Sequence, residues 1–165
     1  MARQTDFTFI VEPVSDEQVD WMFEAGLDLN VSDHDGLTFV LATVSGVDPV
    51  SEALALAAKL QMTYGVRVRR ADLELVNQSM IADLCDVSRE AVSQWVAKDS
   101  FPLPHTVVRT PLWAWSDVVA WLHQVGRLTD DTMPASSQQV EDFNQRWRHM
   151  MVTADADLAP DAVAA

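Results

Sequence analysis

Side chains that could do chemistry are concentrated in two stretches of the sequence, residues 28–35 and 79–98. The first stretch offers oxygen and nitrogen donors of the kind that bind cations, at Asp28, Asn30, Ser32, Asp33, His34 and Asp35. Its spacing lacks the bidentate glutamate that completes a calcium loop, and Asp35-Gly36 is a strong hairpin signal. We therefore expect a solvated hairpin tip here and no metal site.

Nothing in the sequence requires an enzyme. It contains no glycine-rich phosphate loop and no nucleophile elbow, and its four histidines are scattered along the chain. Cys85 is the only cysteine, so no intrachain disulfide can form and nothing suggests an oxidising compartment. The sequence thus predicts neither catalysis nor a cofactor.

The second stretch has the pattern of two short helices joined by a tight turn. Apolar residues recur at the spacing of one helical face, at Ile81, Ala82, Leu84 and Cys85 in the first helix and at Val92, Trp95 and Val96 in the second. Between them, Ser88 has the side chain of a helix N-cap. Two short helices at this spacing form a helix-turn-helix.

Residues 81–89 (IADLCDVSR), followed by Ala91-Val92 and Trp95, resemble DNA-binding domains of the MerR and excisionase (AlpA-like) kind. The resemblance continues through FPLP (101–104), LWAW (112–115) and SDVVAWL (116–122). It implies a recognition helix, then a β-hairpin that forms a wing, then a Ser-Asp-capped helix that packs behind both. Asp86 stands where such turns usually have glycine, and aspartate tolerates the left-handed conformation better than most residues.

If the second helix enters a major groove, its outward side chains are Ser88, Arg89, Glu90, Ser93, Gln94 and Lys98. Gln94 suits adenine, and Arg89 suits guanine or a phosphate. Arg109 and Thr110 would contact DNA from the wing tip, and Arg69 and Arg70 would add phosphate contacts. The alternative for each residue taken alone is ordinary solvent-exposed surface. We expect the tryptophans of this segment to fill a small core rather than to stack on bases.

The chain has 165 residues and a formal net charge of −14, which argues at first against a nucleic-acid partner. The acid lies mainly outside the middle third: residues 1–68 hold three basic and eleven acidic residues, residues 69–127 hold six and seven, and residues 128–165 hold two and seven. The recognition segment is therefore nearly neutral. We expect modest, salt-sensitive affinity for DNA.

The first half of the sequence predicts elements in the order β-α-β-β-α-β, the order of a ferredoxin-like sandwich. Expected strands cover residues 7–12, 27–31, 37–44 and 66–76, with helices over 15–25 and 48–64. The first helix should have a capping box, Ser15 with Gln18, and the second should begin at Asp48-Pro49. Such a half ahead of the DNA-binding segment also resembles small actinobacterial DNA-binding proteins.

We therefore expect an α+β protein with a ferredoxin-like domain over 5–76 and a winged helix-turn-helix domain over 77–127. A polar linker through Pro134 would lead to an amphipathic helix over 136–152, whose apolar face either folds back on the chain or pairs with a partner subunit. Residues 153–165 lack this pattern and are expected to be disordered.

The function predicted from the sequence is that of a sequence-specific regulator, a repressor that binds double-stranded DNA as a homodimer. The alternative is an interaction protein, an antitoxin or inhibitor whose acidic N-terminal half binds a basic protein partner. No apolar run is long enough for a membrane span and no signal peptide is visible, so the sequence predicts a cytoplasmic protein without a membrane partner.

Overall fold

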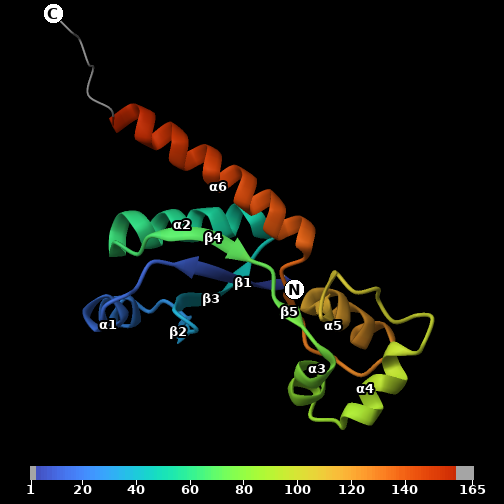
Figure 1. Cartoon of the computed structure of the whole chain (residues 1–165). Helices are drawn as coiled ribbons and strands as arrows, with labels where there is room; N and C mark the ends of the chain where they lie inside the picture. Colours follow the sequence, from blue (N-terminus) through green and yellow to red (C-terminus); the bar gives the residue numbers. More distant parts are fainter. Residues whose placement is uncertain (1–2, 159–165) are drawn as a thin grey trace, which may run out of the picture.

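A computed structural model describes residues 3–158 of the chain, and its fold is mixed α+β, as the sequence predicts. Two separate hydrophobic cores divide the molecule into two units (Figure 1). The larger core takes residues from the first half of the chain together with residues 135–147, and the smaller core lies within residues 76–128. The chain passes from one unit to the other between residues 72 and 75.

The larger unit is built on a sheet with the strand order β2-β3-β1-β4, in which all neighbouring strands are antiparallel. Its elements follow the predicted order and are β1 (Gln4–Val11), α1 (Asp16–Glu24), β2 (Leu29–His34), β3 (Leu37–Ser45), α2 (Pro49–Tyr64) and β4 (Val68–Asp72). Strand β2 begins two residues later and ends three residues later than predicted. The hairpin therefore closes more tightly, with His34 paired directly to Leu37.

Local sequence signals set the ends of these elements. Ser15 and Gln18 form the predicted capping box at the start of α1. Asp48 accepts hydrogen bonds from the Ser51 hydroxyl and backbone N–H at the start of α2, and these bonds lower the pKa of its carboxyl. Asp35 and Gly36 both adopt positive φ, 49° and 81°, in the hairpin turn between β2 and β3.

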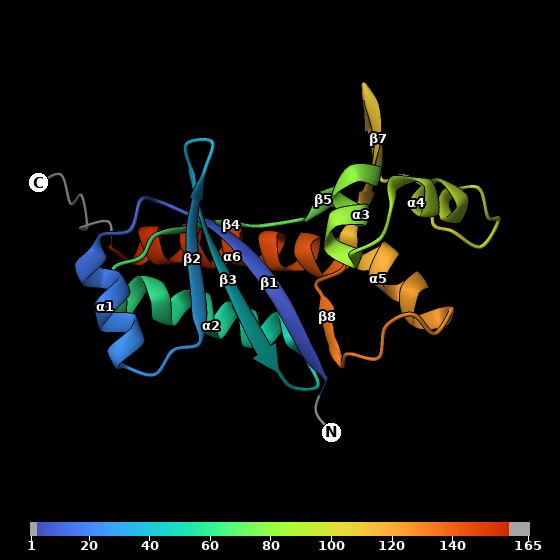
Figure 2. The same cartoon turned by 90° about the horizontal axis from the view of Figure 1, so that it is seen from below.

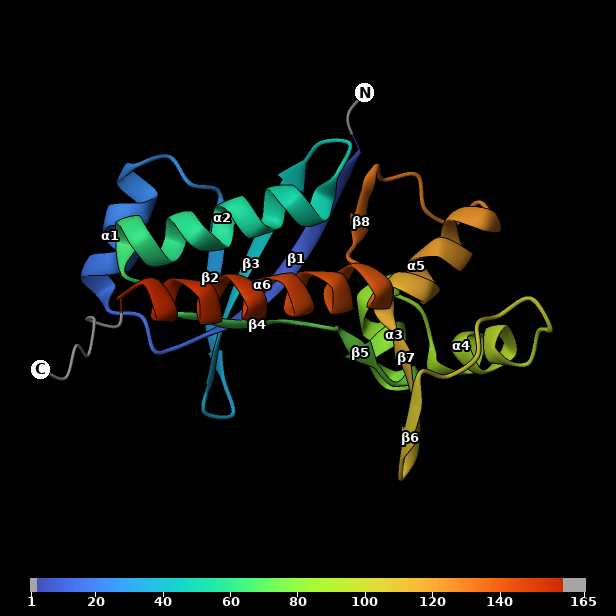
Figure 3. The same ribbon diagram turned by 90° about the horizontal axis from the view of Figure 1, so that it is seen from above.

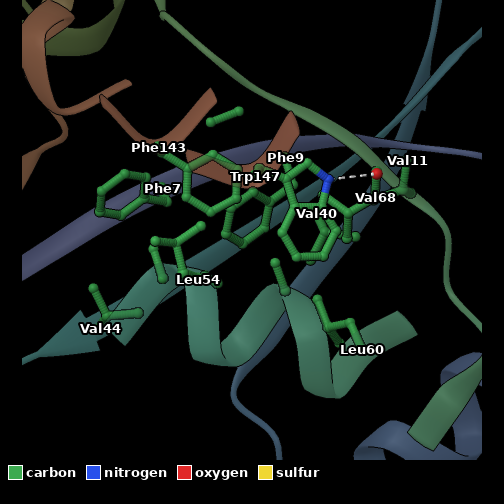
Figure 4. Close-up of a cluster of buried hydrophobic side chains, with 14 of the residues drawn as sticks. Phe7, Phe9, Val11, Val40, Val44, Leu54, Leu60, Val68, Phe143 and Trp147 are labelled. Carbon is green, nitrogen blue, oxygen red and sulfur yellow. Dashed lines mark hydrogen bonds between the residues drawn. The ribbon is translucent and has the colours of Figure 1, made fainter. Parts of the chain in front are cut away.

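Alternation along the strands places one face of the sheet in the core (Figure 4). Phe7 and Phe9 of β1 and Val40 of β3 are fully buried on this face. Helix α2 covers it together with α6 (Ser137–Leu158), which brings in Phe143 and Trp147. The opposite face carries Thr8, Phe39 and Leu41 and has no helix over it, as Figure 2 shows.

The predicted strand over 66–76 is wrong as a single element. β4 ends at Asp72, and the chain then crosses to a second sheet as β5 (Leu75–Val76), which pairs with Trp113 and Ala114. Alternation continues across residues 72–75, so the sequence carries no signal for the change of sheet. The Trp115 N–H donates to the Glu74 carbonyl and ties the crossing to the second unit.

The smaller unit has three helices around a three-stranded sheet of order β5-β7-β6. Its elements are α3 (Gln78–Cys85), α4 (Arg89–Val96), β6 (Thr106–Val108), β7 (Thr110–Ala114) and α5 (Trp115–Gln124). The expected Ser-Asp cap of α5 is wrong, because the N-cap is Ala114 and has no side-chain hydrogen bond. Ser116 and Asp117 lie inside the first turn instead.

The expected linker and tail both differ from the structure. Within residues 128–134, β8 (Thr132–Pro134) pairs in parallel with Gln4–Asp6 of β1, on the same edge that β4 occupies further along (Figure 3). Helix α6 continues to Leu158, so residues 153–158 are helical where disorder was expected. Residues 159–165, for which disorder was also expected, lie outside the described part of the chain.

Helix α6 folds back on its own chain, which decides between the two alternatives for its apolar face. The Trp147 indole N–H donates to the Val68 carbonyl at 3.0 Å (Figure 4). The Asn144 side chain accepts from the Ala71 N–H at 2.7 Å and donates to the Ala71 carbonyl at 3.0 Å. This amide closes the open edge of β4 in the way a neighbouring strand would.

Candidate nucleic-acid interface

The turn between α3 and α4 has the conformation expected at Asp86. This residue adopts φ 53° and ψ 47°, in the left-handed region, and its N–H returns to the end of α3. Ser88 then caps α4 by accepting the Ala91 N–H at 3.1 Å. Val92 and Trp95 face the core, so the other side of this short helix is left to solvent.

The six residues predicted to face outward on or near α4 are all exposed, at Ser88, Arg89, Glu90, Ser93, Gln94 and Lys98. Within residues 3–158, the side chains of Arg89, Glu90 and Gln94 make no hydrogen bond or ion pair with the protein. The structure thus brings a guanidinium, a carboxylate and a primary amide together on one solvent-facing surface. We call these three residues the free face of α4.

The other three predicted contacts on α4 are partly used within the protein. The Ser88 hydroxyl is the N-cap, and the Ser93 hydroxyl donates to the Gln78 side chain at 3.1 Å, which ties α4 to α3. The Lys98 ammonium lies 5.9 Å from the centre of the Trp121 ring, within the range of a cation–π contact. These three side chains therefore already have partners within the protein, and those contacts hold α4 in place.

Arg69 and Arg70 do not belong to the smaller unit. Both lie on β4 of the larger sheet, where Arg69 pairs with Glu12 at 3.4 Å and Arg70 pairs with Asp72 at 2.6 Å. Both pairs are exposed to solvent and therefore weak. Their positive charge is matched locally, and both stand on the larger unit, outside the free face of α4.

The hairpin of β6 and β7 projects from the smaller unit at the position where a wing was expected. Arg109 is the single residue between the paired Val108 and Thr110 and has a positive φ of 63°. Arg109 and Thr110 are exposed at the tip, and so are Val107 and Val108. The hairpin projects from the unit in the same direction as the β2–β3 hairpin, in both Figures 2 and 3.

The donor-rich stretch over residues 28–35 forms part of β2 and the hairpin tip. Asp33 accepts the Thr38 hydroxyl at 2.6 Å, and the His34 ring lies 3.1 Å from the Asp35 carboxylate at the exposed tip. In residues 3–158, no group of three or more His, Cys, Asp or Glu side chains is placed to hold a metal ion. The acidic tip projects to the same side as the wing.

Sequence reasoning did not single out Arg127, which the fold brings against the back of α4. Its guanidinium lies 4.8 Å from the centre of the Trp95 ring. Arg127 and Trp95 also line a small apolar cavity of about 210 Å³ with Cys85, and burial raises the pKa of the Cys85 thiol. No local sequence pattern predicts this contact, because Arg127 follows the glycine after α5 and lies far from Trp95 in the sequence.

Three of the four tryptophans of the smaller unit are core residues, as predicted, and Trp115 is half-buried against the same core. Trp95, Trp113 and Trp121 are at most 4% exposed; Trp113 and Trp121 pack against Phe101, and Trp95 packs against Trp121. The Trp113 and Trp121 indole N–H groups donate to the Pro102 carbonyl and the Ser100 hydroxyl. Rings held in this way are not available to stack on bases.

Comparison with models of known protein families, with curated proteins and with solved structures finds no match to this chain. The residues described here include no helix whose length and apolarity would let it cross a membrane.

Proposed function

We propose that the protein is a sequence-specific DNA-binding repressor that acts as a dimer through a winged helix-turn-helix formed by α3, α4, α5 and the β6–β7 hairpin. The free face of α4 carries this proposal. It follows a tight left-handed turn, and its three side chains have no partner in residues 3–158. An exposed short helix with unpaired polar side chains is the element that such domains place in a major groove.

The chemistry of the free face suits base recognition. Arg89 can donate two parallel hydrogen bonds to guanine, and Gln94 can both donate to and accept from adenine. Glu90 can accept from a cytosine amine or orient Arg89. Each such paired contact discriminates against a wrong base by about 1–3 kcal/mol.

We assign the larger unit a scaffold or sensory role within this proposal. Its element order and its antiparallel strand order β2-β3-β1-β4 are those of a ferredoxin-like sandwich, to which α6 and β8 are added. That architecture hosts many functions and does not identify one. Because the apolar face of α6 is used inside the chain, the proposed dimer forms through another surface.

The experiment that tests the proposal is binding of the purified full-length protein to its own promoter fragment, followed by fluorescence anisotropy. Arg89→Ala combined with Gln94→Ala should weaken specific binding by more than about tenfold, since two base contacts are removed. Arg67→Ala with Gln138→Ala makes the same change of charge and polarity at exposed sites on the larger unit. This control should bind like the unmodified protein.

Specific binding should also weaken steeply as salt rises, because basic side chains displace counterions from DNA. A protein that binds no upstream fragment at low salt is not a DNA-binding repressor. Equal loss of binding in the test and control variants would show that net charge, rather than the free face of α4, carries the interaction.

A second candidate function is favoured by the surface of α1. Trp21 and Phe23 are 50% and 80% exposed on this helix, beside the carboxylates of Asp16, Glu17, Asp20 and Glu24. Exposed aromatic residues among like charges are typical of a surface that binds a protein of the opposite charge. This observation supports an antitoxin or inhibitor that binds a basic protein partner.

The two functions respond to different variants. If the second one holds, a basic protein encoded beside this gene should co-purify with it and dissociate when Trp21→Ala and Phe23→Ala are combined. The same complex should survive Arg89→Ala with Gln94→Ala. Loss of the complex only in the α4 variants would contradict a docking site on α1.

A further inference from the structure

A cavity of about 580 Å³ lies where the two units meet, and no sequence pattern points to it. It is bounded by the start of β1, the loop between β3 and α2, the first turn of α5, β8 and the start of α6. Figure 3 shows β8 between β1 and α5 at this junction. Its volume lies within the range of about 300–1,000 Å³ that is typical of small-molecule sites.

The first turn of α5 presents unused hydrogen-bond donors at this cavity. Helices α1 to α4 each begin with a side-chain cap, whereas the N-cap of α5 is Ala114 and no side chain bonds to the turn. Ser116 lines the cavity and is only 6% exposed, and its hydroxyl has no hydrogen-bond partner within residues 3–158. A buried hydroxyl without a partner is costly. The oxygen is itself shielded from solvent, so an acceptor on a ligand in the cavity would remove that cost once the Ser116 side chain rotates toward it.

A second buried atom shows the same deficiency on the same helix. His123 Nε2 is shielded from solvent and has no partner in the described residues. His123 lies seven residues, about two turns, after Ser116, so both are on the face of α5 that meets β8. Two buried polar atoms on this face of α5 therefore lack hydrogen-bond partners in the described residues.

The charges around the cavity restrict what could fill it. Arg3 is its only basic lining residue and Asp117 its only acidic one, among the residues that the structure describes. Most of the remaining wall is apolar, including Val47, Pro49 and Ala120. One cation, one carboxylate and an apolar wall match a ligand that carries both charges on a small apolar body.

We propose that this junction cavity binds an α-amino acid with an apolar side chain. The ligand carboxylate accepts hydrogen bonds from Arg3, from the rotated Ser116 hydroxyl and from the backbone N–H groups of Ser116 and Asp117, since the Trp115 N–H already donates to Glu74. Its ammonium group pairs with Asp117. Its side chain packs against Val47 and Pro49.

A ligand at this site would act on the element that positions α4. The face of α5 opposite to Ser116 carries Trp121 into the smaller core, where its ring centre lies 5.7 Å from that of Trp95 on α4. Any movement of α5 against β8 is therefore passed to α4 by direct packing. The effect on DNA affinity rests on the proposed function, whereas ligand binding itself does not.

The test uses the full-length protein and the twenty standard amino acids as separate probes, with thermal unfolding and isothermal titration calorimetry as readouts. At least one apolar amino acid should raise Tm in a concentration-dependent way. Its N-acetyl derivative and its amide should not, because each lacks one of the two charges. Arg3→Gln, Ser116→Ala and Asp117→Asn should each weaken binding by about tenfold or more.

Matched controls are Lys59→Gln and Asp20→Asn, which change the same charges at exposed sites of the larger unit. They should leave ligand affinity unchanged. The proposal is overturned if no amino acid of the panel binds, if the three site variants bind like the controls, or if the blocked derivatives bind as well as the free amino acid. Ligand binding by a protein that binds no DNA would support this site and contradict only the repressor.

Discussion

The Asn144 side chain provides the sharpest test of how α6 belongs to the larger unit. Asn144→Ala removes both hydrogen bonds to the backbone of Ala71, a fully buried residue of β4. Each lost bond leaves one buried backbone group without its partner, at a cost of about 1–3 kcal/mol. Water can reach part of this site, so we expect a total loss of about 2–4 kcal/mol in the free energy of unfolding.

That loss is large for a protein of this size, whose total stability is expected to be about 5–15 kcal/mol. Urea denaturation followed by tryptophan fluorescence and by circular dichroism measures it. The matched control is Gln145→Ala, which truncates the next residue on the exposed side of the same helix. Its effect should stay within about 0.5 kcal/mol, as for most surface substitutions.

The reasoning is refuted if Asn144→Ala and Gln145→Ala have the same stability. That result would mean that α6 does not close the edge of β4 in solution, and that its apolar face is free for a partner subunit. Trp147→Phe gives an independent reading, because it removes the indole hydrogen bond to Val68 while keeping an aromatic ring in the core. It should also destabilise the protein, and a neutral effect of both substitutions would establish that α6 is not packed on β4 in solution.

Three further predictions concern the turn, the acidic hairpin and pH. Thermal unfolding should show that Asp86→Gly stabilises the protein slightly and that Asp86→Ala destabilises it by about 1 kcal/mol. The reason is that only glycine adopts a positive φ without cost. The reverse order of stability would contradict the left-handed turn. Asp35→Asn keeps the hairpin turn but removes a negative charge on the side from which the β6–β7 hairpin projects. It should therefore raise DNA affinity at low salt and leave the affinity unchanged at high salt. A gain in affinity that persists at high salt would exclude a purely electrostatic effect. Desolvation, with nearby carboxylates, raises the pKa of Glu74 above its ordinary value of 4.5 although its side chain keeps contact with solvent. The folded protein then keeps this proton to a higher pH than the unfolded chain does, so the free energy of unfolding falls as pH rises above about 4.5. Urea titrations should therefore show that Glu74→Gln stabilises the protein more at about pH 7 than at about pH 4. An equal effect at both pH values would rule out titration of Glu74 as the cause.

Elements with strong local signals could be predicted from the sequence. The capping box at Ser15, the Asp48-Pro49 start of α2 and the Asp35-Gly36 turn all occur where expected. The two short helices and the left-handed Asp86 also follow from residues within a few positions of one another. Such signals are readable because they depend on backbone hydrogen bonds and sterics between near neighbours.

Part of the candidate site was predictable for the same reason. Burial of Val92 and Trp95 at helical spacing requires the free face of α4 to point outward. The sequence could not show that Ser93 bonds to Gln78 or that Arg69 pairs with Glu12, since these pairs join residues 15 and 57 positions apart. It also could not show that Arg127 lies against Trp95.

By itself, therefore, the sequence determined the α+β class, the order of the first six elements and the outward residues of α4. Only the tertiary structure decided that the strand pattern over 66–76 is shared between two sheets, that α6 covers the larger core and that a cavity separates α5 from the loop before α2. Periodicity reports which side of an element is apolar, but it does not report which distant surface will cover that side. The choice is made when the whole chain finds the packing that buries the most apolar surface and leaves the fewest backbone groups unpaired.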